Sequence, residues 1–183
     1  EYICGGGYSN SRIPSSTLCE AYAMLKTLIS DCKALGFDVT TLLDSRIKAL
    51  KPPIFADEII SIESNLEMYE ILINSSKLVD AVYVIAPESD HILEKLLLSI
   101  INSGGKSLNC DINAIIKVSN KMKISMLLKK VGLKSPETVF CDINEKNNKI
   151  KLLVEDLNYP LVFKPIYGVG CDGLSIVKKE NEI

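Results

Sequence analysis

A lysine and a glycine-rich loop near the end of the sequence carry the strongest chemical signal. A β-type run, Leu161 to Lys164, leads into a loop with glycines at 168, 170 and 173, and a second β-type run covers Leu174 to Val177. Glycines let the backbone approach an anion and turn several N–H donors toward it, and a lysine adds a point charge. This pattern predicts a polyphosphate site formed by Lys164 and the loop.

The spacing of these glycines, G-x-G-x-x-G, is also that of dinucleotide-binding folds. In those folds the glycines open a helix, whereas here a second β-type run follows. The loop is therefore predicted to join the strands of a β-hairpin. On this motif alone, an ordinary glycine-rich hairpin with a solvated lysine is the alternative.

A second motif upstream separates the two interpretations. Asn120-Lys121 begins a basic amphipathic helix predicted over residues 120–131, and Val131-Gly132-Leu133, Ser135-Pro136 and Tyr159-Pro160 follow in order. Together with Leu161 to Pro165 and the glycine loop, these segments resemble the small lobe of the ATP-grasp superfamily. The resemblance covers about residues 117 to 183.

The resemblance implies a nucleotide site. In that family two lysines, here Lys121 and Lys164, hold the α- and β-phosphates of ATP, and the loop folds over the β- and γ-phosphates. A merely solvated Lys121 in the first helical turn would oppose the helix dipole, and a bound anion would compensate for this. The candidate nucleotide-binding residues are Lys121, Lys164, Gly168, Val169, Gly170, Cys171, Asp172 and Gly173.

The first part of the sequence alternates β-type runs with amphipathic helices, which is typical of βαβ units and a parallel sheet. We expect Gly36 to end the first helix and Asp90 to cap the third. The run 81–86 is almost wholly apolar, as in a strand covered on both faces. The expected strands are residues 2–4, 37–43, 59–62 and 81–86, and the expected helices are 16–35, 66–77 and 90–103.

The second part is predicted to be α+β. The basic helix should turn Met122, Met126, Leu127 and Val131 inward. A strand at 138–141, a helix ending before Tyr159 and the hairpin follow. The predicted fold class is therefore α/β: a Rossmann-like pre-ATP-grasp domain with a parallel sheet at residues 1–117, and an incomplete ATP-grasp small lobe at residues 118–183.

Three groups in the first part are candidates for binding a substrate. Gly5, Gly6 and Gly7, Arg46 and Glu88 all follow predicted strands, and open α/β sheets bind ligands at the carboxyl ends of their strands. The glycines could equally form a tight turn. Arg46 could bind a carboxylate bidentately or form an ion pair with Asp44 or a neighbour.

The first part also has a narrower resemblance, to the archaeal tyramine-glutamate ligase of methanofuran biosynthesis and its ATP-grasp relatives. The segments that carry it are Glu1 to Tyr8, Leu18 to Leu35, Thr40 to Arg46 and Ile85 to Glu88. It implies an ATP-dependent carboxylate-amine ligase, which forms an amide through an acylphosphate and releases ADP and phosphate. Glutamate and tyramine are the substrates that it suggests.

The sequence does not begin with Met, and it ends just after a β-type run, so we expect a piece of a longer chain that is inactive alone. In the ATP-grasp family the adenine hinge and the Mg²⁺ ligands come from the larger lobe. We therefore expect ATP with Mg²⁺ as cofactors, the metal ligands downstream of residue 183, and no metal site in this chain. One rival is a non-catalytic nucleotide-binding module, and another is a dinucleotide-dependent enzyme that uses Gly5 to Gly7.

Composition limits the other functions. The net charge is −2, from 21 basic and 23 acidic residues, so no nucleic-acid or anionic-membrane binding is indicated. Most of the six cysteines lie in apolar runs and are expected to be reduced and buried, as in the cytoplasm. The one histidine, His91, is expected at the surface or at a helix cap, with no metal cluster or Ser-His-Asp system. Small-molecule substrates are the expected partners, and a homodimer is compatible with the resemblance.

Overall fold

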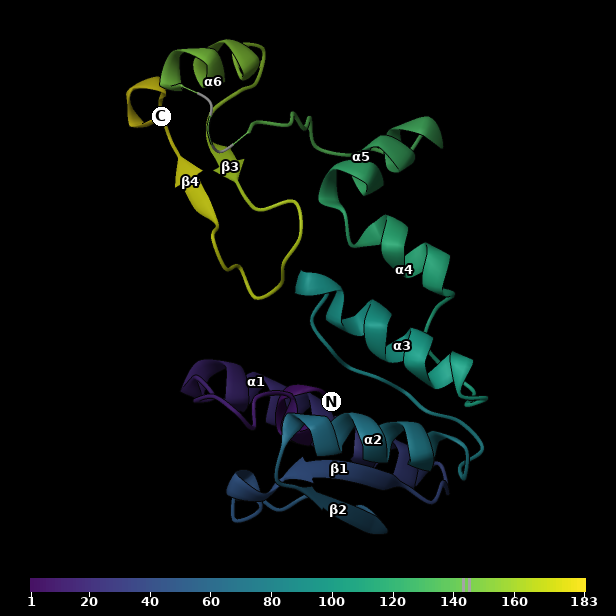
Figure 1. Ribbon diagram of the computed structural model, residues 1–183. Coiled ribbons are helices and arrows are strands. Elements are labelled where there is room, and N and C mark those ends of the chain that lie inside the picture. Colours follow the sequence, from purple (N-terminus) through teal and green to yellow (C-terminus); the bar gives the residue numbers. More distant parts are fainter. Residues whose placement is uncertain (143, 145) are drawn as a thin grey trace. The chain divides into compact units, whose positions relative to one another are not determined.

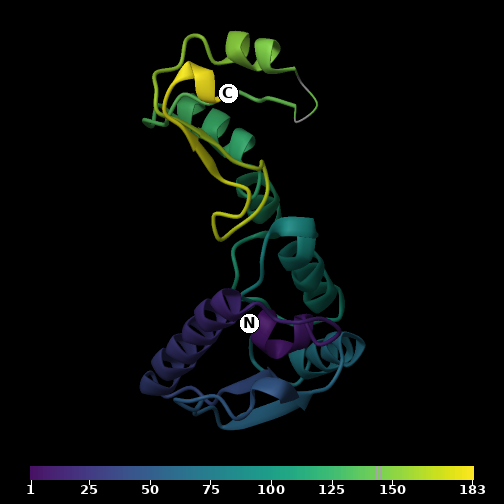
Figure 2. The same cartoon turned by 90° about the vertical axis from the view of Figure 1, so that its left-hand side faces the viewer.

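The computed structural model describes residues 1–142, 144 and 146–183, which fold into two compact units (Figures 1 and 2). The first unit contains Glu1–Pro87 and His91–Asn109, and the second contains Glu88–Asp90 and Cys110–Ile183. The main chain thus passes into the second unit at Cys110. The domain limits 1–117 and 118–183 stay a prediction.

The first unit is built around a small parallel sheet with helices packed against it. Strands β1 (Thr40–Asp44) and β2 (Glu58–Ile62) pair in parallel, with Thr40 opposite Glu58 and Asp44 opposite Ile62. The parallel sheet is therefore confirmed. The other elements are η1 (Ile3–Gly7), α1 (Ser15–Ala34), η2 (Ser45–Ile47), α2 (Asn65–Ser76), η3 (Ser89–His91, shared between the units) and α3 (Ile92–Asn102).

Helix α1 confirms the expected helix 16–35. Its apolar spacing buries Ala21, Leu25 and Ile29, which join a core cluster with Leu43 and Ile47. This core fixes the end of β1 against the helix. Gly36 follows the last turn with φ +85°, a conformation that other residues adopt only with strain, and so ends the helix as predicted.

Helix α2 begins at a capping box. The Ser64 hydroxyl accepts from the Glu67 backbone N–H at 3.2 Å, and the Glu67 carboxylate accepts from the Ser64 N–H at 3.3 Å. The predicted helix 66–77 is confirmed. Figure 2 shows α1 and α2 on opposite sides of the first turn of the chain.

The expected first strand, residues 2–4, is wrong. Residues Ile3–Gly7 form a single turn of π-helix, in which the Gly7 N–H donates to the Tyr2 carbonyl at 2.8 Å. The Glu1 carboxylate also accepts from the Cys4 N–H at 2.7 Å. These local hydrogen bonds use backbone N–H groups that a strand would donate to a neighbouring strand. Gly6, with φ +103°, then reverses the chain.

The prediction of four strands is also wrong. In the described part of the chain, the run 81–86 forms only an isolated parallel bridge, Val82 with Ser107. The amide of Asn109 explains why the ladder stops: its Oδ1 accepts from Val84 N–H at 2.9 Å and its Nδ2 donates to Val84 O at 2.8 Å. A side chain thus takes the groups that a strand would pair. Tyr83 is 51% exposed, so the run is not covered on both faces.

Helix α3 starts later than predicted. His91, not Asp90, occupies the N-cap position, because both residues adopt positive φ (58° and 53°) and the helix forms only after them. The Pro87 carbonyl accepts from the Leu93 N–H at 3.1 Å. Leu96, Leu97 and Ile100 on its inner face are buried, so the helix itself is confirmed.

The second unit contains helices followed by an antiparallel hairpin. Its elements are α4 (Ile112–Val118), α5 (Lys121–Lys130), α6 (Asn147–Leu153), β3 (Leu161–Phe163), β4 (Ser175–Val177) and η4 (Glu180–Glu182). Helix α4 was not predicted, although Asp111 is a recognisable cap: its carboxylate accepts from the N–H groups of Asn113 and Ala114. The hairpin and the helix before Tyr159 are confirmed, with Leu161 opposite Val177.

The inward face predicted for α5 is wrong. Met126 and Val131 are each 60% exposed and Leu127 is 42% exposed, whereas Ser125 is buried. The Ser125 hydroxyl bonds to Ser135 at 3.2 Å and to Thr138 at 3.3 Å. The segment after the helix therefore covers its serine side. For the same reason residues 138–141 form no strand, since Thr138 is held by side-chain bonds.

Candidate functional site

The structure brings the start of α5 against the glycine loop. Lys121 donates its backbone N–H to Ile166 O at 3.1 Å, and its Nζ donates to Gly168 O at 2.8 Å. Asn120, whose side chain caps α5 by accepting from the Lys123 N–H, donates its Nδ2 to the Tyr167 hydroxyl at 3.0 Å. Residues far apart in the sequence thus form one site.

The loop has the backbone conformation that its glycines allow. Gly168, Gly170 and Gly173 have φ of 123°, 67° and 67°. A Cβ on Gly173 would also lie 2.9 Å from Pro165 Cγ, whereas a Cβ on Gly170 would meet nothing within 4 Å. Cys171 adopts φ 60° without being glycine. This succession of left-handed residues turns the chain tightly between β3 and β4.

Several backbone donors of the loop are available. Two bonds close its turns, Asp172 N–H to Val169 O at 3.4 Å and Leu174 N–H to Cys171 O at 3.2 Å. Within the described part of the chain, five other loop N–H groups have no backbone acceptor: those of Gly168, Val169, Gly170, Cys171 and Gly173. Successive donors of this kind form an anion-binding concavity.

The charged side chains around the loop differ in what they can contribute. Lys164 is exposed directly after β3, and no ion-pair partner for it lies among residues 1–142, 144 and 146–183. The Lys121 ammonium has three protons and gives one to Gly168 O at 2.8 Å and another to Ile166 O at 3.5 Å, so one donor remains for a ligand. Asp172 offers a carboxylate, and its N–H is used in the turn, so its place in the site stays a prediction.

The glycines of the first turn are needed for packing. A Cβ on Gly6 would overlap Ile62 Cγ2, and one on Gly7 would overlap the Tyr2 ring. A Cβ on Gly5 would make only ordinary van der Waals contacts with Leu42, at 3.7 Å. The structure therefore shows the tight turn that the sequence allowed, and a binding role for the three glycines stays a prediction.

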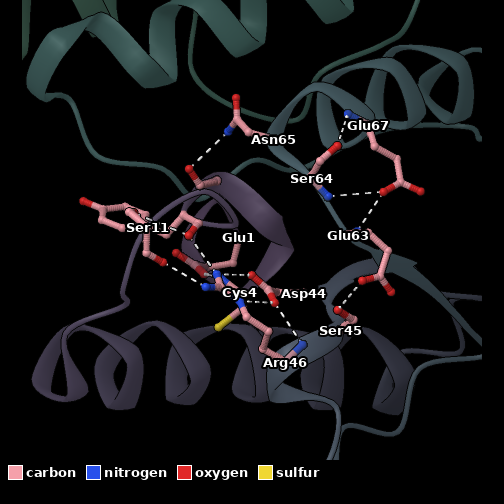
Figure 3. A network of polar contacts seen from close by, with 12 residues as sticks. Glu1, Cys4, Ser11, Asp44, Ser45, Arg46, Glu63, Ser64, Asn65 and Glu67 are labelled. Carbon is pink, nitrogen blue, oxygen red and sulfur yellow. Dashed lines mark hydrogen bonds and ion pairs between the residues drawn. The ribbon is translucent and has the colours of Figure 1, made fainter.

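Arg46 is engaged by its own unit (Figure 3). Its Nε and Nη2 donate to the two oxygens of Asp44 at 2.9 and 2.6 Å, and its Nη groups also donate to Tyr8 O at 2.7 Å and Ser11 O at 2.8 Å. Four of its five N–H donors are thus used, and the ion pair considered from the sequence is present. A carboxylate ligand would have to use the remaining donor or displace one of these contacts.

Asp44 is almost fully buried, at 1% exposure. Burial alone would raise the pKa of its carboxyl group, but the hydrogen bonds and charge of Arg46 outweigh burial and hold the pKa below its ordinary value. The same pairing raises the pKa of Arg46. The ion pair thus links the end of β1 to the loop after the glycines.

Polar side chains surround the start of α2 on the same side of the first unit (Figure 3). Asn65 donates its Nδ2 to Gly7 O at 3.1 Å, and Ser45 donates its hydroxyl to Glu63 at 2.8 Å. The Glu67 carboxylate also accepts from Glu63 N–H at 2.7 Å. The first turn is therefore bonded to the start of α2 through Gly7 and to Arg46 through Tyr8.

Other predicted residues lie apart from this network. Glu88 belongs to the second unit, whereas Gly5 to Gly7 and Arg46 belong to the first. His91 contacts Glu94 through Nδ1 at 2.8 Å in an exposed position, and it occupies the N-cap of α3. Among the described residues there is no group of three or more His, Cys, Asp or Glu side chains that could hold a metal ion.

The cysteines correct one expectation. Of the six, only Cys4 is buried, while Cys19, Cys110 and Cys171 are exposed. Cys19 lies on the outer face of α1, Cys110 at the start of the second unit and Cys171 in the glycine loop. At these places an apolar sequence pattern does not imply burial. No helix among the described residues is long and apolar enough to cross a membrane.

One side-chain contact at the candidate site was missed from the sequence. Asn120 was recognised only as part of the motif, and Tyr167 was given no role, yet their side chains join α5 to the loop at 3.0 Å. An asparagine at a helix N-cap is a detectable signal, since its side chain commonly bonds the first turn. Its second bond, to a tyrosine 47 residues away, depends on the tertiary fold.

The fold and the comparisons agree on a class: residues 37–115 match the pre ATP-grasp 3 domain. The α/β fold with a parallel sheet agrees with this match and with the predicted fold class. The superfamily resemblance is supported, whereas the narrower likeness to tyramine-glutamate ligase stays a prediction.

Individual relatives point the same way. The carbamoyl phosphate synthase large chain of Pyrococcus furiosus is 25% identical over 126 residues, which are 69% of this chain and 11% of that protein. The biotin carboxylase domain of Hydrogenobacter thermophilus 2-oxoglutarate carboxylase, solved with MgADP, ADP and bicarbonate, has 19% identity and a TM-score of 0.65 over 85% of this chain and 35% of that one. Campylobacter jejuni biotin carboxylase has 16% identity and a TM-score of 0.66 over 84% and 36%. The chain thus spans about a tenth of the first relative and about a third of the others.

Proposed function

We propose that this chain is the N-terminal part of an ATP-dependent carboxylate-amine ligase and that its second unit grips the phosphates of ATP. The observation that carries the proposal is the contact of Lys121 with the carbonyl of Gly168, which joins the two predicted phosphate-binding segments in one site. The likeness to carbamoyl phosphate synthase and to the biotin carboxylases supports the same class of reaction.

The residues of the loop fit a polyphosphate. Within the described part of the chain, five N–H groups from Gly168 to Gly173 have no backbone acceptor, and the ammonium of Lys164, which leads into the loop, has no ion-pair partner. Lys121 would add a second positive charge from the start of α5. Positioning and neutralisation of charge are the main contributions of a protein to phosphoryl transfer.

When bound, ATP would supply the phosphoryl group that turns a carboxylate into an acylphosphate, from which an amine displaces phosphate. Mg²⁺ would help to neutralise the phosphates. The residues of this chain would bind and orient the nucleotide, and they include no cluster among the described side chains that could hold the metal. As the sequence resemblance implies, the metal ligands would come from the larger lobe, downstream of residue 183.

The substrate side belongs to the first unit in this proposal. The remaining N–H donor of Arg46 and the turn at Gly5 to Gly7 are the candidate contacts for a carboxylate. Glu88, which belongs to the second unit, is a separate candidate for binding a substrate. The sequence resemblance makes glutamate and tyramine the first pair to assay. A homodimer is a further expectation, and the similar H. thermophilus domain was solved as a dimer.

Nucleotide binding is the direct test. Isothermal titration of the 183-residue chain with ATP and with tripolyphosphate should give weaker binding for Lys164→Ala. Lys178→Ala is the matched control, because Lys178 follows Val177 at the end of the hairpin opposite the loop. Equal binding by both variants would contradict the assignment of Lys164.

Turnover separates the two candidate functions. ADP release by the complete enzyme that depends on glutamate and tyramine, and that Lys164→Ala abolishes, would establish the ligase and this substrate pair. Nucleotide binding with no ADP release in the presence of any carboxylate and amine would favour the non-catalytic module, which the absence of a metal cluster among the described residues also permits.

A further inference from the structure

A cavity in the first unit separates β1 from the extended run 82–84. Its walls are Thr40 to Leu42 on one side and Val82 to Val84 on the other, and Glu1, Tyr2 and Gly5 also line it. Its volume is about 110 Å³, and it is partly open to solvent. By the same measure a cavity of about 10–15 Å³ holds one water, so this space is much larger than a water site. We call this space the strand slot.

Two strand edges face the strand slot. In an extended run, successive residues direct their backbone N–H and carbonyl groups to opposite sides. The backbone groups of Val82 and Val84 form hydrogen bonds with residues 106–109. The N–H groups of Tyr83 and Ile85 therefore point the other way, and they have no acceptor in the described part of the chain. On the opposite wall, β1 pairs with β2 and with no second strand among the described residues.

One hydrogen bond of the kind found between parallel strands already exists at the end of the strand slot. Tyr2 donates its N–H to Ile85 O at 2.7 Å. In a parallel ladder the residue two positions earlier in the same strand would donate to Tyr83 O and accept from Ile85 N–H. That residue would directly precede Glu1, which lines the strand slot.

The chemistry of the strand slot favours an apolar segment. Besides Leu42, Val82 and Val84, it is lined by Met68 and Leu72 of α2 and Leu96 of α3. A strand with both faces covered is typically apolar throughout. Burial also lowers the pKa of the Glu1 α-amino group. A peptide bond at that nitrogen would replace a poorly solvated charge by a neutral N–H donor.

We propose that the strand slot takes an apolar β-strand of about five residues, parallel to β1 and joined to the nitrogen of Glu1. The strand would pair with β1 on one side and with residues 81–85 on the other. It would thereby make one continuous parallel sheet of β2, β1, the added strand and the run 81–86. This inference is independent of the proposed ligase function.

Hydrogen exchange by NMR tests the proposal on the whole chain. One protein carries Val-Ile-Val-Ile-Val before Glu1, and its matched control carries Gly-Ser-Gly-Ser-Gly. We expect the N–H groups of Tyr83 and Ile85 to exchange at least about tenfold more slowly in the first protein. The Leu108 N–H, already bonded to Val82 O at 2.9 Å, should be protected in both. Equal exchange at Tyr83 and Ile85 would overturn the proposal.

Two further measurements keep the test sharp. Proline in place of the valine directly before Glu1 removes the donor to Tyr83 O, so the protection should fall. If the Gly-Ser protein is unfolded, native-like dispersion of amide signals in the Val-Ile protein alone would support the proposal. A free Val-Ile-Val-Ile-Val peptide could also be added to the chain without an extension. If it slowed the exchange of the Tyr83 and Ile85 N–H groups as much as the covalent extension does, the proposed covalent link to Glu1 would be overturned.

Discussion

The ammonium of Lys121 donates a hydrogen bond to the carbonyl oxygen of Gly168 at 2.8 Å. This bond fixes the distance between the start of α5 and the loop after β3. It also holds a positive charge beside a row of backbone donors, so a change at either residue should affect both loop order and anion binding.

Lys121→Met keeps the apolar stem of the side chain and removes its charge. Since a hydrogen bond to a charged group contributes about 1.5–3 kcal/mol, tripolyphosphate and ATP should bind about 10- to 100-fold more weakly. Isothermal titration measures this effect. Lys123→Met, an exposed position on the same helix, is the control and should change affinity little. Equal losses in both variants would indicate a general effect of charge and not a specific contact.

Gly173→Ala should destabilise the hairpin more than Gly170→Ala. Both residues have φ 67°, so the cost of the left-handed conformation is shared, about 1 kcal/mol in each case. Only at position 173 would the added Cβ approach Pro165 Cγ, at 2.9 Å. Urea unfolding of the two variants isolates this contact, and identical midpoints would show that Pro165 moves aside without cost.

Gly6→Ala should strongly destabilise the first unit. The added Cβ would overlap Ile62 Cγ2, a side chain that is fully buried at the end of β2, and φ +103° is unfavourable for alanine. We expect a loss of about 2–4 kcal/mol in the free energy of unfolding. Gly5→Ala, with contacts no closer than 3.7 Å, is the control. A Gly6→Ala protein as stable as Gly5→Ala would contradict the observed packing.

The buried ion pair of Asp44 and Arg46 predicts a dependence of stability on pH. Because the pKa of Asp44 is lower in the folded protein, its contribution is fully present above the ordinary pKa and is lost as the pH falls through the folded value. Denaturation midpoints measured from neutral to acidic pH should therefore fall in the acid range. Asp44→Asn should be less stable at neutral pH and should show a smaller acid loss.

Asp31→Asn is the control for this experiment, because Asp31 is exposed on α1. Asp31→Asn should leave the denaturation midpoint at neutral pH, and the decrease of that midpoint in acid, close to those of the unchanged protein. An acid loss of the same size in Asp44→Asn as in the unchanged protein would show that other carboxylates govern the acid transition.

The sequence predicted those elements whose signals are local. Ser64 and Glu67 form a capping box that marks the start of α2 in the sequence and in the structure. Gly36 ends α1 for the same kind of reason, since its positive φ is an intrinsic preference of glycine. The alternation of β-type runs and helices in the first part predicted a parallel sheet, and β1 and β2 do pair in parallel, although no α-helix lies between these two strands.

The failures involve contacts between distant residues. The apolar run 81–86 looks like a strand, but its pairing is ended by Asn109, a residue that no local pattern singles out. In α5 the apolar periodicity suggested a buried face of Met126 and Leu127. The structure instead covers Ser125, through hydroxyl bonds to the following segment.

The candidate site was predicted in part. The order of the Lys121 and Lys164 motifs indicated one site, and the structure joins Lys121 to the loop. The sequence could not decide whether Arg46 meets a substrate or Asp44. The geometry shows Asp44, because the guanidinium and carboxylate planes fit as a bidentate pair at the end of one strand.

The amide of Asn109 also has a consequence for association between molecules. Val84 would otherwise present a backbone N–H and a carbonyl on the side of the run away from β1, and unpaired groups at such a border invite strands from other copies. One side chain occupies both groups, at 2.9 and 2.8 Å. Residues 106–108 bond to Val82 on that side and Asn109 bonds to Val84, so neither valine offers a free backbone group there to a strand of another molecule.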